Sequence, residues 1–216
     1  MTVVHQGRAA GSTLRQPSLV SRQDWLADES LRLDPSGGER WPRETEPLRE
    51  VVLHHTKTPN SDRDSAARVR AIYEFHAAQR GWGDIGYHLV VDEAGIVFEG
   101  RAGTAELLDG GPAVVGGHVY GHNEGTVGIA MLGTLFEQPP SRRAWTALVE
   151  VLAWLAYRHN LDPLGAGGAS LTIRAHCDLA PTTCPGAASY ELLPTLRAQV
   201  AAAVSGWPGQ TGVAAR

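Results

Sequence analysis

The sequence predicts a single α/β (α+β) domain in which helices pack on a central mixed β-sheet. Its 216 residues, 43% hydrophobic and 19% charged, are enough to bury one core of ordinary size. Segments with the period of strands and segments with the period of helices follow one another in the order β, α, β, β, β, α, α. This order is typical of helices that cover a mixed sheet.

The first strong strand signal is the β-rich segment 51–55. Successive side chains of a strand point to opposite faces, so Val52 and His54 share one face while Leu53 and His55 share the other. The two neighbouring histidines therefore cannot do the same work.

A helix is expected next, ending near Arg80, with Ser61 or Asp62 as its cap and Gly81 as its stop. The apolar face of this helix recurs at intervals of three and four residues: Ala66, Val69, Ile72, Phe75 and His76. Two strands joined by a Gly-containing turn, a buried strand and two helices complete the pattern, at residues 87–91, 96–99, 127–132, 141–159 and 194–204.

The polar, unpatterned ends of the chain predict a loose segment over 1–17 and a flexible tail over 205–216, which leaves 18–204 as the domain. The formal net charge is -4 and no basic run exceeds Arg142-Arg143, so we expect no nucleic-acid partner. No apolar stretch is long enough to span a membrane, and no signal peptide is visible. We expect a monomer.

His176 and Cys184 lie eight residues apart in a loop rich in Pro and Thr. One imidazole, one thiolate and a second histidine from a central strand would form a donor set that zinc prefers and that leaves one position for water. Three other interpretations stay open on spacing alone. Cys184 and His176 could be a nucleophile and its base, Cys177 could form a disulfide with Cys184, or these residues could have no chemical role.

Four segments, in order, resemble the zinc-dependent N-acetylmuramoyl-L-alanine amidase and peptidoglycan recognition protein family: VVLHHTKTP (51–59), RGWGDIGYHLVVDEAGIVFEGR (80–101), GGHVYGHNEGTVGIAMLGTL (116–135) and AHCDLAPTTCPG (175–186). The segment 21–30 resembles the lead-in of bacterial members. The resemblance implies a zinc site in a surface groove, with one zinc ion held by His54, His176 and Cys184. Members that only bind the cell wall typically lack the cysteine ligand, so its presence favours an enzyme.

The resemblance also implies catalytic roles for Tyr87 and for Thr182, which stands where some members carry a lysine. The expected reaction is hydrolysis of the amide between N-acetylmuramic acid and the L-alanine of the stem peptide. The pair Gly81-Trp82 together with Arg101 accompanies stems with meso-diaminopimelate, whose extra carboxylate is a partner for a guanidinium. Further groove positions match the substrate-binding residues of the family: His76, His118, Tyr120 and Asn123.

Two competing functions follow from the same residues. A binding module that does not hydrolyse peptidoglycan would need no Cys184, and a cysteine hydrolase would be indifferent to chelators. Peptidoglycan lies outside the membrane, so we expect an extracytoplasmic or secreted protein; recycling of muropeptides in the cytoplasm is the alternative.

Overall fold

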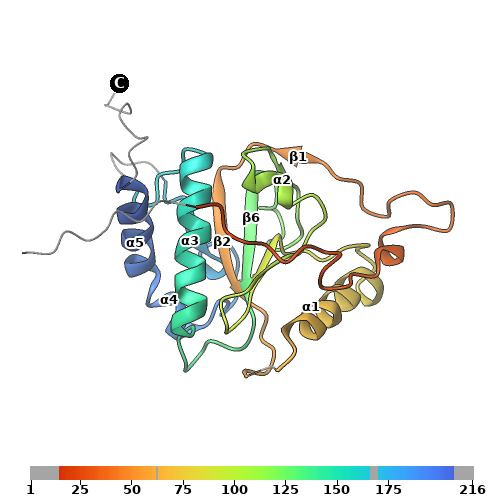
Figure 1. Cartoon of the computed structure of the whole chain (residues 1–216), viewed down its shortest axis with the longest axis horizontal. Coiled ribbons are helices and arrows are strands. Elements are labelled where there is room, and N and C mark those ends of the chain that lie inside the picture. Colours follow the sequence, from red (N-terminus) through yellow and green to blue (C-terminus); the bar gives the residue numbers. More distant parts are fainter. Residues whose placement is uncertain (1–14, 62, 166–169, 207–216) are drawn as a thin grey trace, which may run out of the picture.

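The computed structural model describes residues 15–61, 63–165 and 170–206 (Figure 1). Its centre is a five-stranded sheet with the order β4-β3-β6-β2-β7. β4 runs antiparallel to β3, whereas β3, β6, β2 and β7 are parallel to one another. These strands span Val97–Glu99 (β4), Leu89–Val91 (β3), Thr126–Met131 (β6), Glu50–His55 (β2) and Ile173–Ala175 (β7). The predicted mixed sheet in an α/β domain is thus confirmed.

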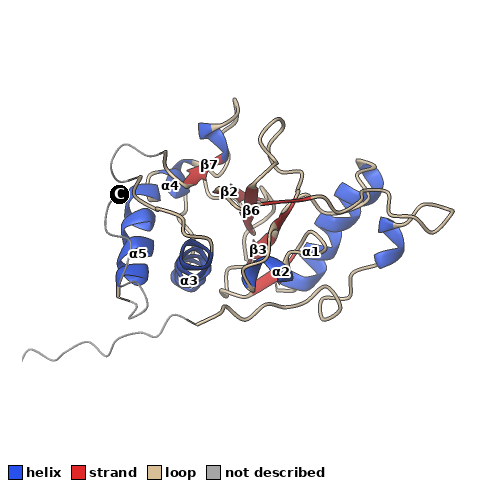
Figure 2. Ribbon diagram, turned by 90° about the horizontal axis from the view of Figure 1, so that it is seen from above, coloured by secondary structure: helices blue, strands red, loops and turns tan. Residues whose placement is uncertain are grey.

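Helices cover both faces of this sheet, as Figure 2 shows, with α3 and α5 on one side and α1 on the other. The helices are α1 (Ser65–Glu74), α2 (Ala105–Leu108), α3 (Arg142–Arg158), α4 (Ala187–Tyr190) and α5 (Leu193–Ser205). A π-helical turn, Phe75–Gln79, continues α1, and 3-10 turns span Glu29–Arg32 and His176–Asp178. No helix among the described residues is long and apolar enough to cross a membrane.

The alternation of β2 decides which side chains reach which core. Val51 and Leu53 join the cluster formed with α3 and α5. His54 points to the opposite face, where α1 contributes Val69 and Ile72 to a second cluster. Both faces of β2 are therefore buried, which explains why the residues between Glu50 and the two histidines are all apolar.

Several local predictions differ from the structure. The cap of α1 is Asp64, whose carboxylate accepts from the Ala67 amide at 2.9 Å; it is not Ser61, and Asp62 lies outside the described residues. Phe75, predicted on the apolar face, is exposed. Three strands lie where none was predicted: β7, and the pair β1 (Thr45–Glu46) and β5 (Ala113–Val114), which is antiparallel. Segments of two or three residues are too short to show a period.

His88, just before β3, is a buried histidine whose proton is placed by its two partners. The Gly128 amide donates to Nδ1 at 2.9 Å, so Nε2 carries the hydrogen and donates to the Val114 carbonyl at 2.6 Å. Burial is the main cause that lowers the pKa of His88 to about 4. The folded protein thus holds this imidazole neutral at pH values where the unfolded chain is protonated.

This difference predicts acid sensitivity. Because the unfolded chain binds a proton near pH 6.5 and the folded chain near pH 4, the free energy of unfolding falls as the pH drops through this window. We expect His88 to account for a loss of about 2 kcal/mol between pH 7 and pH 5, measured by urea unfolding. His88→Gln should flatten this slope, whereas His122→Gln, at an exposed position, should leave it unchanged. Equal slopes in all three proteins would contradict the assignment.

Candidate metal centre

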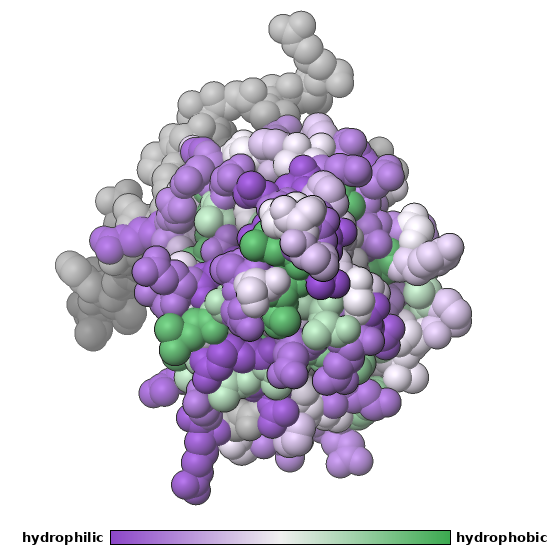
Figure 3. All heavy atoms as spheres, turned by 90° about the vertical axis from the view of Figure 1, so that its right-hand side faces the viewer, coloured by the Kyte–Doolittle hydropathy of each residue, from purple (hydrophilic) through white to green (hydrophobic). Residues whose placement is uncertain are grey.

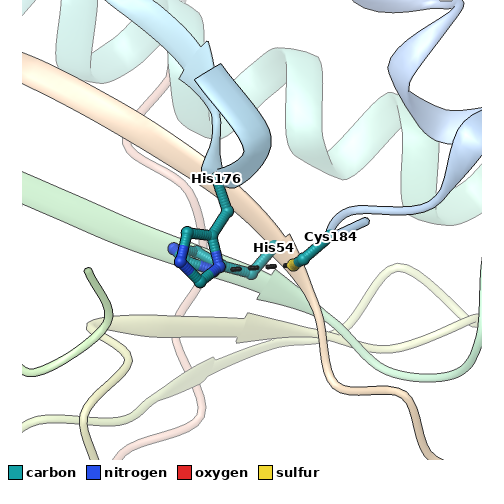
Figure 4. A group of neighbouring side chains, drawn as sticks. All are labelled: His54, His176 and Cys184. Carbon is teal, nitrogen blue, oxygen red and sulfur yellow. Dashed lines mark hydrogen bonds between the residues drawn. The ribbon is translucent and has the colours of Figure 1, made fainter. Parts of the chain in front are cut away.

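Strand pairing brings two of the predicted ligands together. β2 and β7 are parallel neighbours in which Leu53 lies opposite Ala175, so the next residues, His54 and His176, emerge side by side. Their ring centroids are 4.6 Å apart. Cys184 reaches the same point from the loop before α4, and Figure 4 shows the three side chains converging.

The donor atoms of His54, His176 and Cys184 all lie within 4.8 Å of one another, and Nδ1 of His54 is 3.7 Å from Sγ of Cys184. Zinc binds imidazole nitrogen at about 2.0 Å and thiolate sulfur at about 2.3 Å, which places two tetrahedral ligands about 3.5 Å apart. The spacing and the donor types therefore fit zinc. His54 and Cys184 are buried, whereas His176 is half-buried. A bound ion would therefore face the groove on the side of His176.

A chain of hydrogen bonds behind His54 decides which of its nitrogens is free. The hydroxyl of Thr126 donates to the His122 carbonyl at 2.6 Å, so its oxygen accepts from Nε2 of His118 at 3.2 Å. Nδ1 of His118 must then accept from Nε2 of His54, 3.1 Å away. This arrangement leaves Nδ1 of His54 unprotonated and aimed at Cys184, as a metal ligand requires.

The protonation of the two buried ligands favours a metal over a cysteine nucleophile. Burial lowers the pKa of His54 well below its usual value, with His118 and His176 adding to the effect, so the ring is neutral. Burial also raises the pKa of the Cys184 thiol to about 11. A nucleophilic cysteine needs a depressed pKa, whereas a metal ion deprotonates its thiol ligand directly. Cys177 and Cys184 are both free thiols, which rules out the predicted alternative of a disulfide.

Tyr87 lies beside this cluster. Its ring centroid is 5.3 Å from that of His54 and 5.4 Å from that of His76. Burial raises the pKa of its hydroxyl, and the nearby Cys184 acts in the same direction. Tyr87 therefore stays a neutral hydrogen-bond donor at physiological pH.

Thr182 is exposed on the loop that carries Cys184. Its oxygen accepts a hydrogen bond from the Cys184 amide at 3.3 Å, so the side chain braces the turn that presents the thiol. The hydroxyl hydrogen has no acceptor among the described hydrogen bonds of Thr182, which leaves it able to donate to a ligand.

A cavity of about 720 Å³ opens next to His176. Its walls include four residues predicted to bind substrate: Trp82, His118, Tyr120 and Asn123. Tyr120 is fully exposed at the rim, and the amide oxygen of Asn123 accepts from the backbone of His118 at 2.9 Å. Figure 3 views the side of the molecule with α1 and the segment around residue 40, where a few hydrophobic patches are exposed in a mainly hydrophilic surface.

His76 is not among the lining residues of this cavity. It is buried behind Trp82, with the ring centroids 4.8 Å apart, and its Nδ1 accepts from the Gly86 amide at 3.2 Å. The structure thus places His76 as a support for Trp82 and Tyr87.

Arg101 lies in a buried network of charged groups. It is 0% exposed, and its guanidinium donates to Asp84 at 2.8 Å and to the carbonyls of Trp41 and Pro42. Asp84 also binds Arg22 at 3.0 Å. Arg101 was predicted to hold a substrate carboxylate; in the structure its guanidinium is paired with the buried carboxylate of Asp84, since a buried charge must be paired within the protein.

Asp84→Ala should lower the free energy of unfolding by about 3–5 kcal/mol, since it leaves buried arginines without their counter-charge. Asp64→Ala, which removes the exposed cap of α1 and a 4.0 Å surface ion pair with Arg70, should cost about 1 kcal/mol. Denaturant unfolding of both variants measures the difference. Equal losses would show that the Asp84 network adds nothing beyond a local contact.

Three residues near the site carried no signal in the sequence. Arg40 and Trp41 line the cavity from a loop rich in Pro and Gly, and Thr126 begins β6 as an ordinary strand threonine. Their partners lie far along the chain or depend on the strand register, so no local motif could have indicated them.

The fold and the donor set define an α/β protein with a His-His-Cys cluster at the edge of a groove. The chain belongs to the N-acetylmuramoyl-L-alanine amidase family, whose model matches residues 44–187. This confirms the resemblance.

Relatives of two kinds are found. The chain is 26% identical over 210 residues to peptidoglycan-recognition protein LB of Drosophila melanogaster, covering 94% of this chain and 74% of that protein. It is 33% identical over 154 residues to a human N-acetylmuramoyl-L-alanine amidase, covering 69% of this chain but 24% of that protein. A solved structure of peptidoglycan recognition protein LE in complex with tracheal cytotoxin, a monomeric diaminopimelic acid-type peptidoglycan, has a TM-score of 0.62 and 26% identity, covering 82% of this chain and 92% of that one.

Proposed function

We propose that the protein is a zinc-dependent N-acetylmuramoyl-L-alanine amidase. The observation that carries the proposal is the convergence of His54, His176 and Cys184 beside Tyr87, at the edge of a groove. Family membership alone does not decide the activity, because relatives include both amidases and recognition proteins. The presence of the Cys184 thiol among the candidate ligands supports an enzyme rather than a recognition protein.

Each residue near the cluster has a distinct task in this proposal. Bound zinc would supply a water of lowered pKa and would polarise the scissile carbonyl. Tyr87 donates its hydroxyl to the oxygen on which negative charge develops, and Thr182 offers a second, neutral donor. Trp82 and Tyr120 provide apolar surface on which the sugar and peptide of the substrate can lie.

We infer that the preferred substrate carries meso-diaminopimelate in its stem. The Gly81-Trp82 pair supports this preference, as does the structural likeness to a protein solved with a diaminopimelic acid-type muropeptide. Because peptidoglycan is built outside the membrane, we also propose that the protein acts in an extracytoplasmic location. We further propose that it acts as a monomer.

Mass spectrometry of a defined N-acetylmuramoyl peptide, incubated with the protein, tests this function. We expect release of a free peptide that begins with L-alanine. A chelator should abolish the release and back-titration with Zn²⁺ should restore it. Intact substrate in the presence of added zinc would refute the amidase and favour the binding module. Product formation that survives chelation but not alkylation would favour the cysteine hydrolase.

The hydrogen-bond chain behind His54 makes a separate prediction about metal affinity. His118→Phe should weaken zinc binding by about 10–100-fold, because Nε2 of His54 loses the acceptor that orients the ring. Thr126→Val should act in the same direction with a smaller effect. Competition with a chromogenic chelator measures the affinity. Thr146→Val, on the exposed side of α3, serves as the control. Equal zinc affinities in all variants would show that the hydrogen bonds behind His54 do not contribute to metal binding.

A further inference from the structure

His55 is a buried histidine next to a candidate zinc ligand, and the proposed reaction gives it no task. It follows His54 in β2 but points to the opposite face of the sheet, and it is 5% exposed. Its Nδ1 accepts a hydrogen bond from the Leu135 amide at 3.1 Å, so Nε2 carries the ring hydrogen. Burial lowers the pKa of His55 to about 4, which keeps Nδ1 an acceptor at neutral pH.

The backbone of His55 faces the thiol of Cys184. β7 pairs with β2 only as far as Leu53 and Ala175, and the chain then turns into the 3-10 helix His176–Asp178. Two residues past Leu53, and therefore at the same edge of the strand, the His55 amide donates to Sγ of Cys184 at 3.4 Å. The sulfur thus lies where a strand partner would continue. An N–H donor at this point favours the ionised form of the thiol that a metal binds.

The ring of His55 supports the same loop from a second side. Leu135, whose amide donates to the ring, precedes Phe136, and the Ala188 amide donates to the Phe136 carbonyl at 3.2 Å. Gly186 packs so closely on this segment that an added Cβ would come within 2.3 Å of the Leu135 carbonyl oxygen. The ring of Phe136 lies edge-on to that of His55, with the centroids 5.0 Å apart. This segment therefore connects the imidazole to the loop before α4, which carries the thiol.

We propose that His55 is a positioning residue that fixes the Cys184 thiol, through its amide at the sulfur and its imidazole on the segment 135–136. This inference rests on the proposed function for the role of Cys184 as a zinc ligand. A site binds more tightly when its ligands are already held in place, because less freedom is lost on binding. The same support extends to Thr182, whose oxygen accepts from the Cys184 amide at 3.3 Å. The paired histidines thus have different tasks, since His54 is a ligand and His55 holds another ligand.

Two substitutions of similar shape separate the hydrogen bond of His55 from the volume of its ring. Asparagine and leucine are nearly isosteric, but only asparagine offers an acceptor where Nδ1 of histidine lies. His55→Leu should weaken zinc binding by at least about tenfold in competition with a chromogenic chelator, whereas His55→Asn should stay within about threefold of the unsubstituted protein. His159→Leu controls for lost stability, because it removes a 2.9 Å hydrogen bond to the Leu107 carbonyl at the C-terminal end of α3.

Reactivity of the Cys184 thiol gives a second readout that needs neither metal nor substrate. The sequence has two cysteines, so Cys184 is the only thiol in a full chain that carries Cys177→Ala. In this background, freed of metal, His55→Leu should raise the rate of alkylation at least about tenfold, because the loop opens more often once a buried hydrogen bond is lost. His55→Asn and His159→Leu should leave the rate unchanged. Gly186→Ala should act like His55→Leu, since its Cβ would displace the loop from the segment that the ring supports.

The outcomes distinguish this role from the proposed activity. If His55→Leu and Gly186→Ala change neither the zinc affinity nor the alkylation rate, the positioning role is refuted and the zinc amidase is unaffected. If His55→Asn is as impaired as His55→Leu, the hydrogen bond is not responsible and the proposal is overturned. If the unsubstituted protein binds no zinc, yet alkylation accelerates only in His55→Leu and Gly186→Ala, the positioning of the thiol stands and the zinc amidase is refuted.

Discussion

Replacing Cys184 with alanine is expected to abolish zinc binding and amidase activity together. Cys184 is the only anionic donor of the cluster when ionised, and its Sγ lies 3.7 Å from Nδ1 of His54. Loss of this ligand leaves two imidazoles, one of them half-buried, which is one protein ligand fewer than a catalytic zinc site has. We expect kcat/KM to fall by at least about a thousandfold, equivalent to about 4 kcal/mol of transition-state stabilisation.

Cys177→Ala is the matched control for this experiment. Cys177 is a half-buried free thiol seven positions earlier that takes no part in the donor set. Zinc content, measured by elemental analysis after gel filtration, should stay near one per chain in this variant and fall close to zero in Cys184→Ala. A Cys184→Ala protein that keeps both its zinc and its activity would disprove the proposed metal centre.

Tyr87→Phe is expected to reduce kcat by about 10²–10³-fold while KM and zinc content change little. The phenylalanine keeps the ring contacts with His54 and His76 but removes the less exposed of the two hydroxyls proposed to donate to the developing oxyanion. The effect should appear in kcat because this hydrogen bond strengthens only as charge builds on the oxygen.

Tyr73→Phe controls for the loss of a tyrosine hydroxyl elsewhere. The Tyr73 hydroxyl donates to the Asp28 carbonyl at 3.0 Å in the second core cluster, so its removal should affect stability and leave kcat unchanged. Steady-state kinetics on the muramoyl peptide measures both variants. If Tyr87→Phe turns over substrate at the rate of the unsubstituted protein, Tyr87 has only a packing role.

The sequence by itself determined the class of fold and the identity of the candidate ligands. Alternation along 51–55 separates His54 from His55, and the structure places them on opposite faces of β2. Helices α3 and α5 follow from apolar side chains at helical spacing, with the predicted cap at Ser141 and a proline in the first turn. Such local patterns are visible because each element must bury one of its own faces.

Only the tertiary structure decided which charged and polar groups are free to meet a ligand. Arg101 looks like a substrate-binding arginine in its motif. In the fold its guanidinium donates hydrogen bonds to Asp84 and to the backbone carbonyl of Trp41, 60 positions away. His118 looks like a groove residue, yet its ring also orients His54 through a contact 64 positions apart. These pairings depend on strand register and loop packing, and a charge must be paired wherever the fold buries it, so no local pattern can reveal them.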